Sequence, residues 1–83
     1  MYQNYPNPFN PVTSIRFQIP YLQKVELKIF DILGREVITL VNEEKMTGVY
    51  EVKFNASNLA SGVYFYRLKT QDFIASKKLL LLK

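Results

Sequence analysis

The sequence of 83 residues contains no cysteine, no histidine and only three glycines. Without cysteine, the chain has neither disulfides nor thiolate ligands for a metal ion. Without histidine, it lacks the side chain that most often serves as a general base near neutral pH. The glycines stand apart from one another, which excludes a glycine-rich phosphate loop. We therefore expect no metal, no cofactor and no catalytic residue.

The side chains that could still carry chemistry are serines, lysines and carboxylates. A serine beside Lys77 or Lys78 would form a nucleophile–base pair, but solvated lysines on a strand are the simpler interpretation. Glu43 and Glu44 are the adjacent acids, and Lys45 follows them, which indicates a solvated turn. No run of acids has the spacing of a calcium loop. These residues do not point to an enzyme.

Strong charge of one sign and long apolar runs are also missing. The net charge is +4 and the basic residues are scattered, unlike the clustered basic patch of a nucleic-acid-binding protein. The longest leucine run, Leu79–Leu82, is far shorter than the roughly 20 apolar residues of a membrane-spanning helix. Met1 leads directly into polar residues, without the apolar segment of a secretory signal. We interpret Met1 as an added start and the chain as a domain cut from a longer protein.

What the sequence does contain is a dense pattern of strands. Hydrophobic residues make up 48% of the chain, enough for one small core. Polar and apolar residues alternate over short segments about 10–12 residues apart, which is typical of half-buried β-strands in a sandwich. The predicted strands comprise residues 14–19, 24–30, 36–42, 49–54, 63–69 and 73–83. We predict an all-β sandwich of six to seven short strands.

Some local expectations follow from the same pattern. Residues 36–42 are apolar on both faces, so this strand is predicted to lie deep in a sheet. Residues 42–48 read as a polar loop. Pro20 and Gln23 are expected in the turn between the first two strands. Gly34 is expected to adopt a positive φ in a short reversal.

A glycine turn precedes the late aromatic strand. Leu59, Gly62 and Tyr64 form the pattern L-x-x-G-x-Y, which is the sequence form of a tyrosine corner. In such a corner the phenol bonds to backbone a few residues upstream; the alternative is an ordinary core tyrosine. Tyr64 and Tyr66 share one face of the strand and Phe65 takes the other. We therefore favour core packing over an aromatic platform for sugars or bases.

The N-terminal segment YPNPFNP places prolines at positions 6, 8 and 11. Proline removes a donor and restricts the preceding residue, so this segment is neither helix nor central strand. We divide a single domain of residues 1–83 into a proline-rich leader, 1–13, and a sandwich, 14–83. The leader either packs on an edge of the fold or is recognised by another molecule.

Three segments in this order resemble a known family. NYPNPFNPVTSIRF, NLASGVYFYRL and SKKLLLLK are similar to the type A C-terminal sorting domain of the type IX secretion system, the Por secretion tail family. The resemblance covers nearly the whole chain. It implies an immunoglobulin-like antiparallel β-sandwich that acts as a non-enzymatic C-terminal secretion signal. It also implies an N-terminal passenger, an outer-membrane translocon as partner, and export through the periplasm to the cell surface or the medium.

The resemblance further implies which residues the translocon contacts. They comprise the leader motif and the terminal lysine pair: Pro6, Asn7, Pro8, Phe9, Asn10, Pro11, Lys77 and Lys78. In many members a sortase-like peptidase later removes the signal. Two alternatives concern packing alone, since the leader could simply close the fold and the lysines could only discourage aggregation of the last strand. We expect a monomer that binds no nucleic acid and has no transmembrane segment.

Two other functions fit the same pattern of residues. An immunoglobulin-like binding or adhesion module, for carbohydrate or protein, would also lack cysteine and be rich in tyrosine. A structural module could assemble through its strand edges. At the level of the sequence both alternatives stay open.

Overall fold

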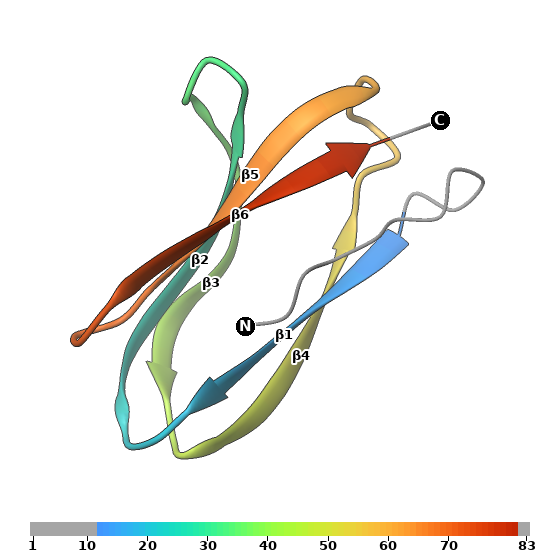
Figure 1. The fold of residues 1–83 in the computed structure, drawn as a ribbon. Helices are drawn as coiled ribbons and strands as arrows, with labels where there is room; N and C mark the ends of the chain where they lie inside the picture. The colour runs from blue at the N-terminus through green and yellow to red at the C-terminus, as the bar shows by residue number, and fades with distance from the viewer. Residues whose placement is uncertain (1–11, 82–83) are drawn as a thin grey trace.

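A computed structural model describes residues 12–81, and these residues form six β-strands and no helix. The strands are β1 (Val12–Ile19), β2 (Gln23–Asp31), β3 (Glu36–Lys45), β4 (Gly48–Asn55), β5 (Gly62–Lys69) and β6 (Ile74–Leu81). All pairings are antiparallel, and the strands form two sheets (Figure 1). The predicted all-β fold is confirmed, and the arrangement is consistent with an immunoglobulin-like sandwich.

The two sheets are unequal in size. The larger sheet has the order β3-β2-β5-β6, and the smaller one pairs β1 with β4. The chain changes sheet from β1 to β2, from β3 to β4 and from β4 to β5. As a result β2 and β5 lie next to each other although two strands separate them in the sequence. Among the strands of residues 12–81, only β2 and β5 have a partner strand on both sides.

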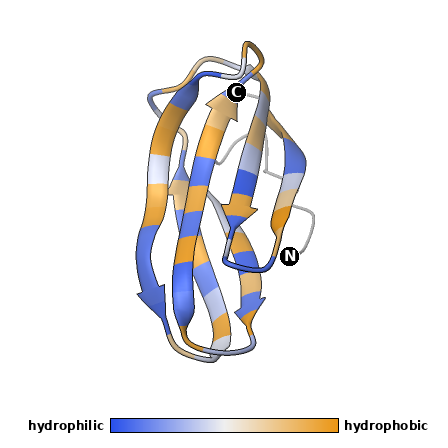
Figure 2. Cartoon of the chain, turned by 90° about the vertical axis from the view of Figure 1, so that its left-hand side faces the viewer, coloured by the Kyte–Doolittle hydropathy of each residue, from blue (hydrophilic) through white to orange (hydrophobic). Residues whose placement is uncertain are grey.

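The core lies between the two sheets and follows the alternation of the sequence. Ile15, Phe17 and Ile19 of β1 turn inward and are at most 1% exposed. In β2, every second residue from Val25 to Ile29 is fully buried in the same way. Figure 2 shows this alternation as hydrophilic and hydrophobic bands along the strands. Burial of these apolar side chains is the main force that holds the sheets together.

The side chains of the aromatic strand β5 lie on the faces that were predicted. Tyr64 and Tyr66 lie in the core, whereas Phe65 is 36% exposed on the outer face of the large sheet. Leu68 continues the inner face and is also buried. The structure thus separates the aromatic side chains between core and surface, as expected for neighbours in a strand.

The prediction for residues 36–42 is wrong. In the described part of the chain β3 is an edge strand that pairs only with β2, and Val41 is its one buried residue. It also extends to Lys45, so most of the predicted loop 42–48 belongs to the strand. Pairing with β2 brings the polar residues after Val41 into the ladder, which their side-chain polarity does not reveal.

The predicted turn between the first two strands is present at residues 20–22 and contains Pro20, but the placement of Gln23 in it is wrong. Gln23 does not lie in a solvated turn; it is the first residue of β2 and is 3% exposed. Its side-chain Nε2 donates to the carbonyl of Tyr21 at 3.3 Å, and its Oε1 accepts the N–H of Gln71 at 3.3 Å. A buried amide is tolerated here because backbone groups satisfy it. Gly34 has the expected positive φ, 82°.

Candidate recognition surface

β6 presents the lysine pair on an edge of the large sheet. Lys77 and Lys78 are both exposed, and they stand opposite Tyr66 and Phe65 of β5. By strand parity Lys78 lies on the outer face, while Lys77 lies on the inner face with Leu79. Lys77 remains exposed because β6 has no neighbour beyond it in the part of the chain that the structure describes. The pair therefore offers charge on both sides of one open edge.

The two leucines that follow this pair fix β6 to the fold. Leu79 and Leu81 are 1% and 2% exposed, whereas Leu80 points outward and is 48% exposed. The lysines are thus part of a strand whose C-terminal half is anchored by two leucines buried in the core. They are held as a fixed feature of the sheet and not as a loose basic tail.

The segment from Leu59 to Tyr64 leads from the β4–β5 connection, one of the three crossings between the sheets, into β5. The Tyr64 hydroxyl donates to the carbonyl oxygen of Ala60, four residues upstream, at 2.7 Å. Gly62 has a φ of 153°, a region that residues with a side chain rarely adopt. Leu59 packs against the core, and its N–H donates to the Ala56 carbonyl at 3.0 Å. These are the contacts that a tyrosine corner makes; its contribution to stability stays a prediction.

Motifs far apart in the sequence meet at one end of the sandwich. Val12, where β1 begins, stands opposite Asn55 at the end of β4. Leu81, where β6 ends, stands opposite Gly62 at the start of β5. The segment from Asn55 to Gly62 joins these two pairs, as can be followed in Figure 1, and leads directly into Tyr64 of the corner. The start of β1, the corner and the end of β6 therefore share one end of the molecule.

The leader itself is not part of this description. Pro6, Asn7, Pro8, Phe9, Asn10 and Pro11 lie outside the described residues, so their predicted role stays a prediction. The strand that follows them begins at Val12, two residues earlier than the sequence predicted. Val12 and Thr13 thus belong to β1 and not to the leader.

A second feature of the large sheet was missed in the sequence. Arg67 of β5 places its guanidinium 4.7 Å from the centre of the Phe30 ring, on the outer face. Its Nε is buried and has no hydrogen-bond partner among the described residues. Phe30 and Phe65 stand directly opposite each other, and Phe65 stands opposite Lys78. The register of β2 with β5 creates this row of side chains, and only the strand order reveals it.

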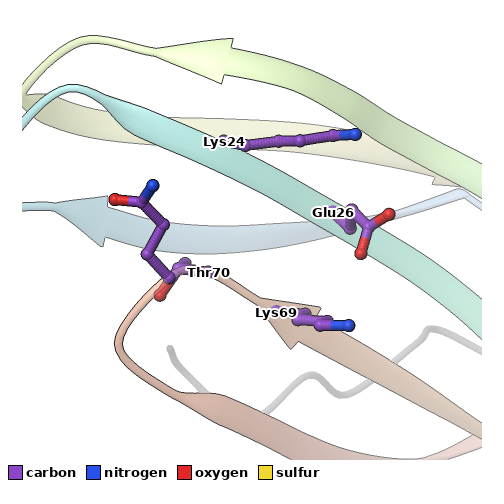
Figure 3. Close-up of a pocket in the computed structure, with 5 residues that line it drawn as sticks. Lys24, Glu26, Lys69 and Thr70 are labelled. Atoms are coloured by element: carbon purple, nitrogen blue, oxygen red, sulfur yellow. The ribbon is translucent and has the colours of Figure 1, made fainter.

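Other surfaces of the described part offer little chemistry. A shallow depression beside the β5–β6 turn is lined by Lys24, Glu26, Lys69, Thr70 and Gln71. In Figure 3 Glu26 lies between the two lysines, so the charges there are mixed and open to solvent. Within residues 12–81, no group of three acidic side chains is placed to hold a metal ion. No helix in that range is long and apolar enough to cross a membrane.

Comparison with known proteins gives one match. A family model described as the secretion system C-terminal sorting domain matches residues 3–82, which is nearly the whole chain. Searches of curated proteins and of solved structures return no match. The family match does not support the alternative of an adhesion module. The matched range includes the proline-rich segment, the corner and all of β6.

Proposed function

Because this chain belongs to the family of secretion system C-terminal sorting domains, we propose that it directs a passenger protein across the outer membrane through the type IX secretion system. The family is one of sorting signals and not of enzymes. In this proposal residues 1–83 act as one non-enzymatic sorting signal, and the residues before Val12 are its leader. The passenger precedes the domain and reaches the cell surface or the medium through the periplasm.

The observation that carries the proposal is the extent of the family match. It spans residues 3–82 and so includes the segments on which the resemblance depends, except for Lys83. A shared sandwich fold alone would not support a sorting function, because one fold serves many functions. The meeting of the corner and the end of β6 at one end of the molecule adds a physical reason. A partner protein that binds this end of the molecule could contact the corner and the end of β6 at the same time.

We propose that the translocon contacts the leader motif and the lysine pair. The leader residues in this proposal are Pro6, Asn7, Pro8, Phe9, Asn10 and Pro11. Lys77 and Lys78 supply the positive charge from a strand anchored by Leu79 and Leu81. A fixed charge loses less conformational freedom on binding than a charge on a loose tail. A sortase-like peptidase is a second partner if the signal is removed after export.

The test is a transport assay with a fusion protein. The domain is placed behind a fluorescent passenger that carries its own inner-membrane export signal, in a bacterium with a working type IX system. We expect the passenger on the cell surface or in the medium. If the intact domain leaves the passenger in the periplasm of several such hosts, the sorting function is wrong.

The lysine pair is tested with a matched control. Lys77→Gln with Lys78→Gln should leave most of the passenger in the periplasm. Lys24→Gln with Lys53→Gln removes the same charge from exposed positions on other strands and should be exported like the wild type. Surface substitutions of this kind usually change stability by no more than about 0.5 kcal/mol, so both variants should fold. Full export of a folded Lys77, Lys78 variant would show that the pair is not a recognition element.

A further inference from the structure

The open edge of β6 is regular over its whole length. β5 and β6 pair from Gly62–Leu81 to Lys69–Ile74 with no shift in register. On the other side of β6, no strand of the described residues is paired. A regular, unpaired edge is a template on which an extended segment can form backbone hydrogen bonds.

The register also indicates which backbone groups point to this edge. The N–H of Thr70 donates to the carbonyl of Phe73 at 2.9 Å, which makes them a hydrogen-bonded pair at the turn. Bonded and non-bonded pairs alternate along an antiparallel ladder. Counting from that pair, the N–H and C=O groups of Ser76, Lys78 and Leu80 point away from β5. The side chains of these three residues are exposed on the outer face of the sheet.

We propose that β6 binds an acidic extended segment of the secretion machinery by strand addition, so that the segment becomes a fifth strand of the large sheet. β6 contains two lysines and no acid, so its charge favours a partner strand with carboxylates. A carboxylate directly opposite Lys78 would form a favourable cross-strand pair. The identity of the partner rests on the proposed function, whereas the binding mode can be measured without it.

Arg67 supplies a second position for an acid. Ser76 stands opposite Arg67, and a depression on the outer face is lined by Phe30, Gly34, Phe65, Arg67 and Ser76. An added strand would lie about 10 Å from β5, or two strand spacings. A glutamate opposite Ser76 would place a second carboxylate beside this depression, where the positive charge of Arg67 attracts it although the guanidinium itself lies over Phe30 on the β2 side. The expected partner thus has acids at two alternate positions.

A second copy of this chain is a poor partner for the same edge. Antiparallel pairing of two β6 strands about their middle would place lysine opposite lysine, because Lys77 and Lys78 occupy the centre of the strand. Like charges directly opposite each other destabilise a strand pair. The lysines therefore discourage self-pairing and favour an acidic strand.

The test is a titration of the isotope-labelled 83-residue chain, followed by NMR. The probe is a capped peptide of alternating valine and glutamate, TVEVEVT, and the control peptide is TVKVKVT. We expect chemical-shift changes at β6 and on the outer face of β5, and slower hydrogen exchange at the amides of Ser76 and Lys78. The lysine peptide should cause neither change. Binding of both peptides alike, binding at another edge, or no binding of TVEVEVT at millimolar concentration overturns the proposal.

Two variants separate the backbone from the charge. Ser76→Pro removes one donor from the open edge, where proline is tolerated, and should weaken peptide binding about tenfold. Lys78→Glu should weaken it to a similar or greater extent, while Lys53→Glu on β4 makes the same change of charge and should have no effect. If Ser76→Pro does not fold by circular dichroism, Lys78→Glu decides. Unchanged affinity in a folded Ser76→Pro or in Lys78→Glu overturns strand addition.

Transport and binding can fail independently. If the wild-type fusion is exported and folded Ser76→Pro is exported equally well, sorting stands and the β6 edge is not its contact. If the wild-type fusion is not exported but TVEVEVT binds at β6, the binding mode stands and the proposed function is wrong. Loss of export in folded Ser76→Pro, together with loss of peptide binding, supports both the sorting function and strand addition at β6.

Discussion

The two edge strands of the large sheet, β3 and β6, differ in regularity. β3 pairs with β2 through two register shifts, which leave Val37 and Leu40 without an opposite residue. β6 follows β5 without a shift over eight residues. Bulges distort an edge so that another strand cannot extend it easily. By this criterion β3 is a closed edge and β6 is an open one.

The charges on the two edges differ as well. β3 contains acids that are paired within the fold, with Glu36 at 3.1 Å from Lys28 and Glu43 at 2.8 Å from Lys45. Within residues 12–81, neither Lys77 nor Lys78 has an ion-pair partner. A bulge hinders pairing with any partner strand, whereas a charge opposes only partners of the same sign. The edge of β6 can therefore select its partner strand, whereas the edge of β3 is protected against strand addition in general.

The largest expected effect is on the free energy of unfolding, and it comes from the leucine side chains that bury part of each edge strand. Leu79→Ala in β6 should lower the free energy of unfolding by about 3 kcal/mol, because Leu79 is 1% exposed and its removal leaves a cavity. Leu40→Ala in β3 should cost about 1 kcal/mol, because that side chain is only half-buried at a bulge. Urea denaturation of both variants measures the difference. Equal losses would mean that the two edges are anchored alike.

A smaller effect on stability is expected from two tyrosine hydroxyl groups, that of Tyr64 opposite β6 and that of Tyr50, which bonds to the segment just after β3. Tyr64 stands opposite Leu79, and its partly buried hydroxyl donates to the Ala60 carbonyl, so Tyr64→Phe should cost about 1 kcal/mol. Tyr50 makes the same kind of bond to the Met46 carbonyl, just after β3, at 2.6 Å. That bond is exposed to water, so Tyr50→Phe should have little effect. A denaturation midpoint of Tyr64→Phe equal to that of the wild type would remove the tyrosine corner as a stabilising feature.

Asp31 and Glu36, which lie beside and in β3, predict that the stability of β3 depends more strongly on pH than that of β6. Hydrogen bonds from the Arg35 N–H, together with contacts to its side chain and the Leu33 N–H, lower the pKa of Asp31 below its ordinary value of 3.8. Hydrogen bonds from Thr39 and Lys28 lower the pKa of Glu36 below 4.5. A lowered pKa favours the ionised form in the folded state. Its contribution to stability is complete above the ordinary pKa and is lost as the pH falls through the lowered one.

We therefore expect acid to loosen β3 before β6, which contains no carboxylate. Hydrogen exchange, corrected for intrinsic rates, should show loss of protection in β3 below about pH 4 while β6 keeps its protection. Asp31→Asn and Glu36→Gln should each make the decline of stability with acid less steep. Simultaneous loss of protection in both strands would show that the carboxylates do not act locally.

The sequence predicted the fold well where polar and apolar residues alternate. The strands around Phe17, Leu27 and Tyr66 were confirmed because one face of each lies on the core. The prediction failed at β3, because apolar side chains on both faces of residues 36–42 do not reveal whether the strand has one neighbouring strand or two. Gln23 was misplaced because its burial depends on backbone groups of Tyr21 and Gln71, the second of which is 48 residues away.

The motifs of the candidate site could be predicted from the sequence, but their arrangement on the surface of the fold could not. Lys77 and Lys78 could be named from the sequence, but their position on an open edge depends on the order β2-β5-β6. The contact of Arg67 with Phe30 joins residues from β2 and β5, whose pairing no local pattern encodes. Long-range register therefore decides which of the predicted residues can act together.

The smallest expected effect on stability is the most informative about the two edges. Lys77→Gln with Lys78→Gln should change the free energy of unfolding by no more than about 0.5 kcal/mol, because both side chains are exposed. It should nevertheless make the domain self-associate, since the regular β6 edge would then lack the charges that oppose pairing of copies. Sedimentation over a range of concentrations measures this, with the wild type expected to stay monomeric. Glu43→Gln with Glu44→Gln is the matched change on β3, and it should leave the domain monomeric because the bulges remain. If the β3 variant associates and the β6 variant does not, regularity of pairing is not what distinguishes an open edge from a closed one in this sheet.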